Sequence, residues 1–252
     1  MDGLGGSGVI SVAFAIGFVV VMFGAVVQST SGIGFGLVAA PLLVLIDPDF
    51  VPGTVIFLGI VVSLLSTLRD ARDVNATLVA AGIAGRLPAA ILAASLLASL
   101  SEVLFQIIFA ALILLAVPLS LFGPSVRPSV PGVALAGVLS GFMGTLTSVG
   151  APPFAIALQN APPHQMRATL NAVLLLGACV SLVSLAAFDR FGWADIMRGI
   201  ALLPAVFLGY HAARFIIRAP ATASWLRPAV LGLCLLASIV LILRASAALA
   251  VS

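Results

Sequence analysis

Charged residues are scarce in this chain, and lysine is absent. Of its 252 residues 8% are charged and 62% are hydrophobic, whereas a soluble globular domain carries about 25% charged residues. This composition excludes a soluble domain and predicts an all-α, polytopic transmembrane helix bundle. All 11 basic residues are arginine, and the net charge is +3. Because they form no basic run or aromatic-basic patch, we expect loops that face an anionic lipid leaflet and no nucleic-acid partner.

Reactive side chains are equally few: two histidines, two cysteines and one glutamate. Cys179 and Cys234 lie inside apolar segments, and their spacing suggests neither a metal site nor a disulfide. A membrane enzyme is therefore disfavoured, and we expect no catalytic residue, cofactor or metal. No nucleotide-binding loop is present, so ATP is not expected to drive the protein directly. Residues 1–6 lack the positive start of a cleaved signal peptide, so we expect the first apolar run to be retained.

Ten apolar segments follow one another along the chain. We expect them at 9–27, 33–46, 54–68, 76–99, 102–122, 132–146, 153–158, 168–188, 196–217 and 225–243. The longest helix-hostile stretch in the middle, 123–128, divides one integral membrane domain into two repeats, 1–123 and 124–252.

The two halves share a constant offset. A shift of 116 residues relates Gly34 to Gly150, Leu87 to Leu203 and Pro88 to Pro204. An odd number of crossings in each half would make the repeats inverted. The positive-inside rule favours ten crossings, with seven arginines inside and three outside, over eight, with six and four. A full span needs about 20 residues, so segments 33–46 and 153–158 are also open to re-entry from one side.

Small polar residues and glycines interrupt the apolar pattern once in each half, within 24–36 and 141–153. A chain breaks its helix in a membrane only where the freed backbone groups find other partners. Broken helices of inverted repeats form midplane substrate sites, and helix N-termini suit anions. The breaks contain no carboxylate, as an anion site requires. The candidate substrate-binding residues are Gln28, Ser29, Thr30, Ser31, Gly32, Gly34 and Gly36 in the first break, and Gly144, Thr145, Thr147, Ser148 and Gly150 in the second.

These residues also have a structural interpretation. The hydroxyl groups could bond to backbone carbonyls, and the glycines could serve close helix packing. Arg86, ten residues into segment 76–99, is the remaining candidate, because a buried membrane arginine is costly and is usually paired or pore-facing. The alternative places Arg86 near the interface, where it caps carbonyl groups. Its repeat partner is Leu202, so an anion-binding role would not be duplicated.

Other polar residues have simpler interpretations. We expect Asn171 to form helix–helix hydrogen bonds, His164 to lie in a loop, and His211 to snorkel toward the interface. The acidic residues at segment ends are expected to be solvated; they are Asp47, Asp49, Asp70 and Asp73.

The sequence around both breaks resembles the TauE/SafE family of membrane permeases. The resemblance rests on residues 31–36 followed by Pro41, and on Gly141, Gly144 and residues 149–153. It covers essentially the whole chain, and it implies a permease for small sulfur-containing anions such as sulfite, sulfoacetate and other organosulfonates. Phe35 inside the first glycine run and Ala151 in place of a glycine depart from the family pattern, which leaves the particular substrate open.

The sequence therefore predicts a secondary transporter that moves a small anion by alternating access at a midplane site. Its expected partners are this substrate and the lipid bilayer of a bacterial-type inner membrane, and a homo-oligomer is left open. An anion channel and a non-transporting scaffold are the alternatives. A carrier saturates and shows counterflow, whereas a channel conducts steadily.

Overall fold

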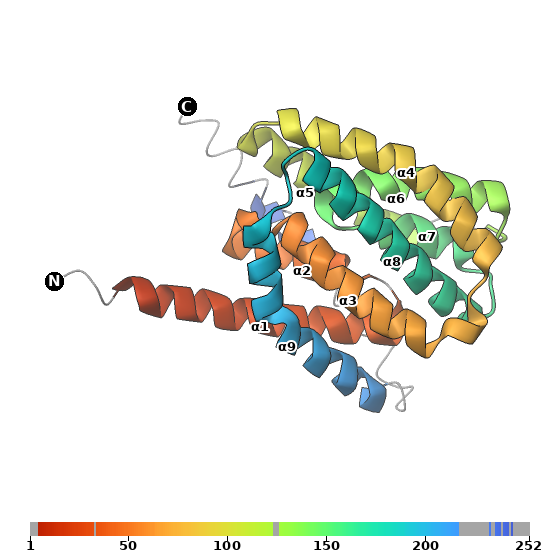
Figure 1. Ribbon diagram of the computed structural model, residues 1–252, viewed down its shortest axis with the longest axis horizontal. Coiled ribbons are helices and arrows are strands. Elements are labelled where there is room, and N and C mark those ends of the chain that lie inside the picture. Colours follow the sequence, from red (N-terminus) through yellow and green to blue (C-terminus); the bar gives the residue numbers. More distant parts are fainter. Residues whose placement is uncertain are drawn as a thin grey trace.

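The computed structural model describes residues 5–32, 34–122 and 126–216, together with 232, 235–237, 239–241 and 243. These residues form α helices and two short 3-10 helices, with no strand among them, so the all-α prediction is confirmed (Figure 1). The predicted last segment, 225–243, falls largely outside the described residues. The helices are α1 (Gly5–Ser31), α2 (Phe35–Ile46), α3 (Gly53–Arg69), α4 (Ala76–Ser99), α5 (Glu102–Phe122), α6 (Val130–Thr147), α7 (Ala151–Leu158), α8 (Pro163–Ala187) and α9 (Trp193–Ile216). The 3-10 helices are η1 (Pro48–Phe50) and η2 (Ala71–Asp73).

Six of these helices are long and apolar enough to cross a membrane, namely α1, α4, α5, α6, α8 and α9. By contrast, α2 has 12 residues and α7 has 8. At a rise of 1.5 Å per residue they extend about 18 and 12 Å, well short of a hydrocarbon core of about 30 Å. By length neither helix crosses alone, which favours re-entry, the alternative that the sequence left open for segments 33–46 and 153–158.

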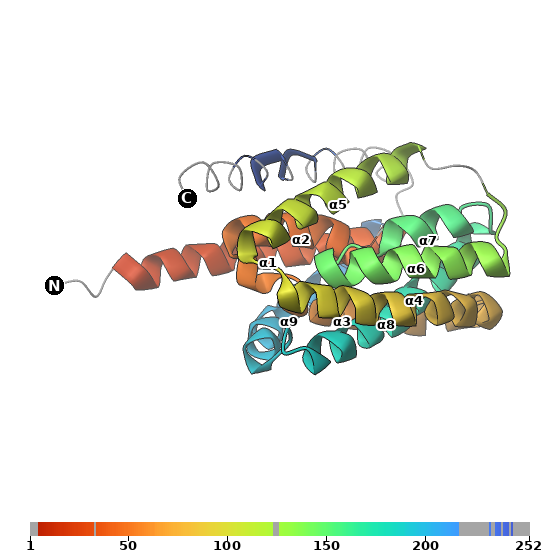
Figure 2. The ribbon, with the colours of Figure 1, turned by 90° about the horizontal axis from the view of Figure 1, so that it is seen from above.

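Each short helix folds back on the helix before it. A Cβ on Gly17 of α1 would lie 3.6 Å from Leu43 Cδ2 of α2, and one on Gly24 would lie 3.1 Å from the Phe35 ring. The α6 and α7 helices form a second hairpin, in which Ser140 Oγ donates to the Gly150 carbonyl at 2.6 Å. The two hairpins approach from opposite ends of the bundle and overlap in its middle (Figure 2). The 116-residue repeat and the division at residue 123 stay predictions.

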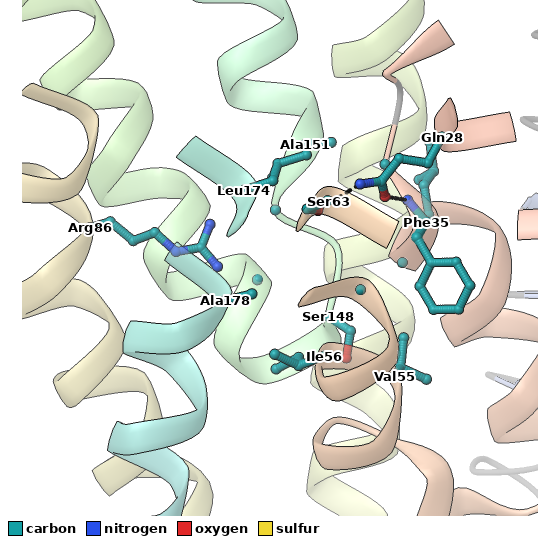
Figure 3. A pocket seen from close by; sticks show the side chains of 16 residues that line it. Gln28, Phe35, Val55, Ile56, Ser63, Arg86, Ser148, Ala151, Leu174 and Ala178 are labelled. Carbon is teal, nitrogen blue, oxygen red and sulfur yellow. Dashed lines mark hydrogen bonds between the residues drawn. The ribbon is translucent and has the colours of Figure 1, made fainter. Parts of the chain in front are cut away.

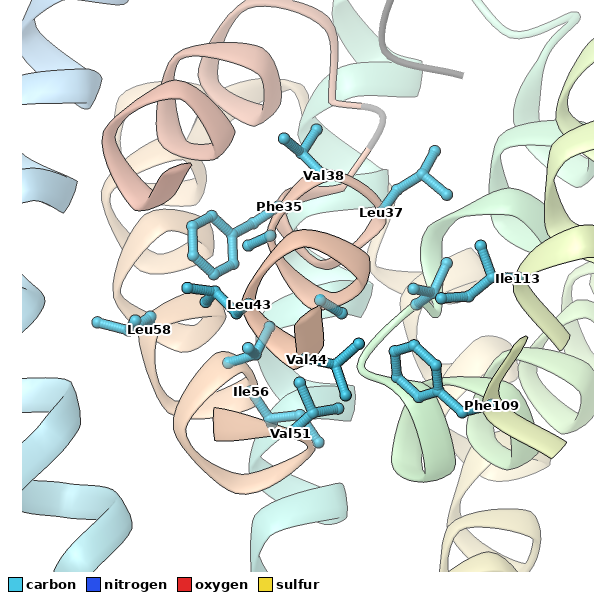
Figure 4. Packing of buried hydrophobic residues seen from close by; sticks show 14 of the residues in the cluster. Phe35, Leu37, Val38, Leu43, Val44, Val51, Ile56, Leu58, Phe109 and Ile113 are labelled. Atoms are coloured by element: carbon cyan, nitrogen blue, oxygen red, sulfur yellow. The ribbon is translucent and has the colours of Figure 1, made fainter. Parts of the chain in front are cut away.

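Helix α2 is enclosed by other helices, which fixes its N-terminus inside the bundle. Its residues Phe35, Leu37 and Val44 are buried among Leu58 of α3 and Phe109 of α5 (Figure 4). A helix that is apolar on all sides is stable only when protein or lipid covers every face. The first break is therefore held at one depth by packing on both sides.

Helices α4 and α6 pack through a seam of small residues. A Cβ on Gly137 would lie 2.1 Å from the Gly82 carbonyl oxygen, a distance that only glycine tolerates. Close backbone approach of this kind is typical of membrane helix interfaces. The seam brings the Arg86 backbone against α6, next to the second break.

The arginines gather mainly at one end of the bundle. Arg69 shares Asp70 with Arg167, and Tyr210 lies between Arg69 and Arg214. At the opposite end, Arg198 pairs with Asp49. Arg69, Arg167 and Arg214 therefore share one end of the bundle, although they come from three different helices.

Candidate functional site

The first break is shorter than the sequence suggested. Helix α1 continues to Ser31, so Gln28 to Ser31 lie in its last turn rather than in the interruption. Thr30 Oγ1 donates to the Val26 and Val27 carbonyls at 2.9 and 3.0 Å, as helical hydroxyls commonly do. The turn itself contains Gly32 and Gly34, whose φ angles of 72° and 104° favour glycine.

The second break follows the end of α6. Ser148 adopts φ 64° and its N–H donates to the Gly144 carbonyl at 2.9 Å, which ends the helix. Thr147 Oγ1 donates to the Met143 carbonyl at 2.7 Å and accepts from the Val149 N–H at 3.2 Å. Prolines near the start of α7 are tolerated because the first N–H groups of a helix have no partner inside it. Thr147 therefore stabilises the turn.

The tips of the two hairpins touch. A Cβ on Gly34 would lie 2.5 Å from the Ala151 Cβ, and one on Gly36 would lie 1.8 Å from the Ser148 carbonyl oxygen. No residue with a side chain fits at position 36 unless one backbone moves. The interrupted helices thus meet at a backbone contact between α2 and the α6–α7 turn.

A cavity of about 40 Å³ lies beside this contact (Figure 3). A cavity holds a water molecule once about 10–15 Å³ is open to a water-sized probe, so the space suits a few waters or a small ion. Seven predicted site residues line it: Gln28, Gly34, Gly36, Arg86, Gly144, Ser148 and Gly150. The lining does not include Ser29, Thr30, Gly32, Thr145 or Thr147. The side chain of Ser31 lies outside the described part of the chain.

Gln28 connects three helices at the cavity wall. Its Nε2 donates to Ser63 Oγ at 2.7 Å and to Asn171 Oδ1 at 3.3 Å, and its Oε1 accepts from the Phe35 N–H. The bond to Asn171 joins α1 to α8, as expected for this residue, and Asn171 Nδ2 donates to the Arg167 carbonyl of its own helix at 2.9 Å. The Gln28 carboxamide therefore occupies the first N–H of α2, and Ser63 joins the cavity without having been singled out by sequence.

Arg86 is buried, with 3% of its surface exposed, in the interior of α4. The interfacial alternative is therefore wrong. Its Nη1 donates to Ser140 Oγ at 2.6 Å and its Nη2 to Ser181 Oγ at 3.1 Å. No carboxylate pairs with Arg86 in the described ranges, and its Nε has no hydrogen-bond partner there. Among the described residues, the hydrogen-bond partners of this buried guanidinium are the hydroxyl groups of Ser140 and Ser181.

Small residues make room for this guanidinium. A Cβ on Gly177 of α8 would lie 2.4 Å from Arg86 Nε, and Cβ atoms on Gly144 and Gly150 would lie 2.9 Å from its Nη2 and Nη1. Ser181 is also within 2.8 Å of Thr145 Oγ1, so Thr145 supports the arginine indirectly. Ser140, Gly177 and Ser181 were missed from sequence because each is an ordinary small residue in an apolar helix.

Asp70 is not the solvated residue that its position suggested. Its side chain is 9% exposed and is bound by Arg69 at 3.1 Å and Arg167 at 2.9 Å. Burial by itself raises the pKa of Asp70, but hydrogen bonds from the two guanidinium groups and their charges outweigh it, and the pKa lies below its ordinary value of 3.8. The carboxylate therefore stays ionised at neutral pH.

The model of a family described as sulfite exporter TauE/SafE matches residues 5–241. This chain belongs to the TauE/SafE family. Membership implies a membrane transporter of sulfite or other sulfur anions, and it agrees with the expectation that the chain is not an enzyme. No curated protein and no solved structure matches the chain.

In this TauE/SafE protein, the cavity at the hairpin tips has two features that suit an anionic substrate. Broken helices meet there, and a buried cation lies at its wall. The substrate-binding roles of the lining residues stay predictions.

Proposed function

We propose that this TauE/SafE protein is a secondary transporter that carries a small sulfur oxyanion or organosulfonate, with sulfite as the best-fitting size. The substrate binds in the cavity between the α1–α2 and α6–α7 tips, and alternating access exposes it to either side in turn. We expect the protein to work in a bacterial-type inner membrane.

The unpaired charge of Arg86 carries this proposal. A guanidinium that is removed from water without a counter-charge is costly, and serine hydroxyls compensate only part of that cost. An anion entering the cavity would supply the missing charge. The carboxylates that do pair with arginines lie at the bundle ends, as Asp49 and Asp70.

The other lining groups suit an oxyanion of modest size. The Ser63 hydroxyl lines the cavity and accepts from Gln28, which leaves its O–H to donate, and the glycines at positions 34, 36 and 150 expose backbone at the tips. A volume of about 40 Å³ leaves no space for a long organic chain without rearrangement. This favours sulfite or a short sulfonate over a bulky substrate.

Proteoliposome transport of radiolabelled sulfite tests the proposal. Arg86→Gln removes the charge and should reduce flux at least tenfold, whereas Arg86→Lys should retain part of it, because lysine keeps the charge but not the planar fork. Arg72→Gln is the matched control, because Arg72 is an exposed arginine of η2 that does not line the cavity.

Counterflow separates a carrier from the alternatives. Liposomes preloaded with unlabelled sulfite should accumulate labelled sulfite transiently, and the initial rate should saturate with concentration. A non-saturating conductance would indicate a channel, and the absence of flux would favour a scaffold. Full sulfite flux in Arg86→Gln would refute the assigned site.

A further inference from the structure

Asp70 is held between two guanidinium groups at the arginine-rich end of the bundle. Arg69 donates Nε to Oδ1 and Nη2 to Oδ2, both at 3.1 Å. Arg167 donates Nε to Oδ2 at 2.9 Å and Nη2 to Oδ1 at 3.4 Å. Two forked donors on one pair of oxygens is the geometry by which arginines bind free oxyanions. We refer to Arg69, Asp70 and Arg167 as the Asp70 clamp.

The Asp70 clamp ties several helices together. Arg69 Nη2 also donates to the Ser29 carbonyl of α1 at 3.1 Å, and its guanidinium lies 5.8 Å from the Tyr210 ring of α9. Arg167 belongs to α8, and its Cγ would lie 3.7 Å from a Cβ on Gly32. The clamp therefore joins α1, α3, α8 and α9, and its Arg167 stem covers the first break on this side.

Positive charge exceeds negative charge around the clamp. Arg214 Cζ lies 5.5 Å from the centre of the Tyr210 ring, so three arginines gather around the Asp70 carboxylate. Five buried side-chain N or O atoms lack a partner in the part of the chain that the structure describes, and four of them are here. They belong to Ser29, Ser66, Thr67 and Arg69. Unpartnered buried donors beside spare positive charge are features of an anion site.

The opposite end of the bundle is built differently. A cavity of about 570 Å³ lies there, bordered by Asp49, Arg198 and Pro52 among others. The Arg198–Asp49 pair is open to solvent, with Asp49 69% exposed. Ser148 Oγ donates to the Pro52 carbonyl at 3.1 Å, so the wall between this cavity and the central one is thin. In the described conformation a large cavity thus lies at the Asp49 end, and the Asp70 clamp ties helices together at the opposite end.

We propose that Arg69 and Arg167 form a second anion-binding site, which Asp70 occupies as a tethered competitor while the protein is closed at this end. A small oxyanion leaving the central cavity takes the place of the carboxylate, and the α3–α8 connection opens as Asp70 withdraws. The identity of the transported anion rests on the proposed function. The closing role of the Asp70 clamp does not.

Site-directed labelling tests the closing role. The reporter is Ala178→Cys, which lines the central cavity, in a protein with Cys179→Ala and Cys234→Ala. A membrane-impermeant, anionic thiosulfonate is applied to right-side-out or inside-out vesicles. Asp70→Asn should raise the labelling rate at least tenfold from the Arg69 end and leave the rate from the other end unchanged.

Matched variants keep the labelling result interpretable. Asp73→Asn removes an exposed carboxylate from the same 3-10 turn and should leave both rates at the wild-type level. Asp70→Glu should keep the labelling rates close to those of wild type, since it keeps the negative charge. If Asp70→Asn does not fold, Arg167→Gln breaks the same connection and should open the same end. Wild-type labelling in the folded variants would overturn the closing role.

Thermal stability with inorganic sulfate tests the anion site itself. The combined variant Asp70→Asn/Arg86→Gln removes the competitor and the central cation, so sulfate should raise its melting temperature by several degrees. Further replacement of Arg167 by Gln should abolish this shift, and chloride at equal ionic strength should not reproduce it. An absent shift, or one that survives Arg167→Gln, would overturn the second site.

The labelling and sulfate experiments can fail independently of the sulfite transport experiment. Arg86→Gln should stop sulfite flux, and Asp70→Asn should still raise the labelling rate from the Arg69 end when it is combined with Arg86→Gln. If Arg86→Gln transports normally, the central site is wrong while the labelling and sulfate results still decide the Asp70 clamp.

Discussion

At the scale of single residues, Gly177 controls how Arg86 is placed. A Cβ at this position would lie 2.4 Å from Arg86 Cδ and Nε, so Gly177→Ala should push the guanidinium out of its position. We expect sulfite flux to fall about as far as in Arg86→Gln. Gly192→Ala, where a new Cβ has no heavy atom within 4 Å, is the control for a glycine-to-alanine change. Unaltered flux in Gly177→Ala would show that the position of Arg86 is not important.

Asp70 makes a pH-dependent contribution to stability. Its pKa in the folded protein lies below 3.8, so the stabilising charge is fully present above the unfolded pKa and is lost as the pH falls through the folded one. The melting temperature of wild type should exceed that of Asp70→Asn between pH 7 and 4, and the difference should shrink below pH 3.8. A difference that is constant down to pH 3 would contradict the ion pair.

At the scale of helices, the contact between hairpin tips sets a strict limit on residue size. Gly36→Ala would place a Cβ 1.8 Å from the Ser148 carbonyl oxygen, so the α1–α2 and α6–α7 hairpins must separate. Overpacking of this kind costs about 1–3 kcal/mol or more, and the melting temperature in detergent should fall by several degrees. Gly17→Ala, with an ordinary contact of 3.6 Å, should leave it unchanged or raise it.

Helix boundaries were predictable where the sequence marks them clearly. The segment 76–99 coincides with α4, because Asn75 caps its N-terminus by accepting from the Leu78 N–H and Ser99 precedes a non-helical Leu100. The predicted segment 9–27 ends four residues before α1 does, because the polar run from Gln28 to Ser31 suggests a break. In an apolar setting such hydroxyl groups return their hydrogen bonds to the preceding turn, and the helix continues.

The composition of the site was only partly predictable. Arg86 was a candidate because of its charge, but its partners Ser140 and Ser181 come from the other half of the chain. The same holds for Asp70 and Arg167, which are 97 residues apart. Contacts over such separations depend on how the helices pack, and one sequence carries no direct signal of it.

At the scale of the whole molecule, the arginine distribution predicts orientation. Within the described residues five arginines lie at one end, namely Arg69, Arg72, Arg127, Arg167 and Arg214, and two lie at the other, Arg190 and Arg198. The positive-inside rule therefore places the Asp70 clamp on the cytoplasmic side.

Cysteine accessibility checks this orientation. In the protein without native cysteines, Arg72→Cys should react with an impermeant maleimide only from the cytoplasm. Ser101→Cys, in the exposed α4–α5 connection, should react only from outside. The reverse pattern would invert the assignment.

The close contact between Gly36 and the Ser148 carbonyl also limits how fast an ion can be carried across. An ion cannot slip between the hairpins while they are pressed together, so passage there requires one of them to withdraw. Collective movements of this kind take microseconds to milliseconds. The turnover number would then be limited by the movement of a hairpin and not by diffusion of the ion.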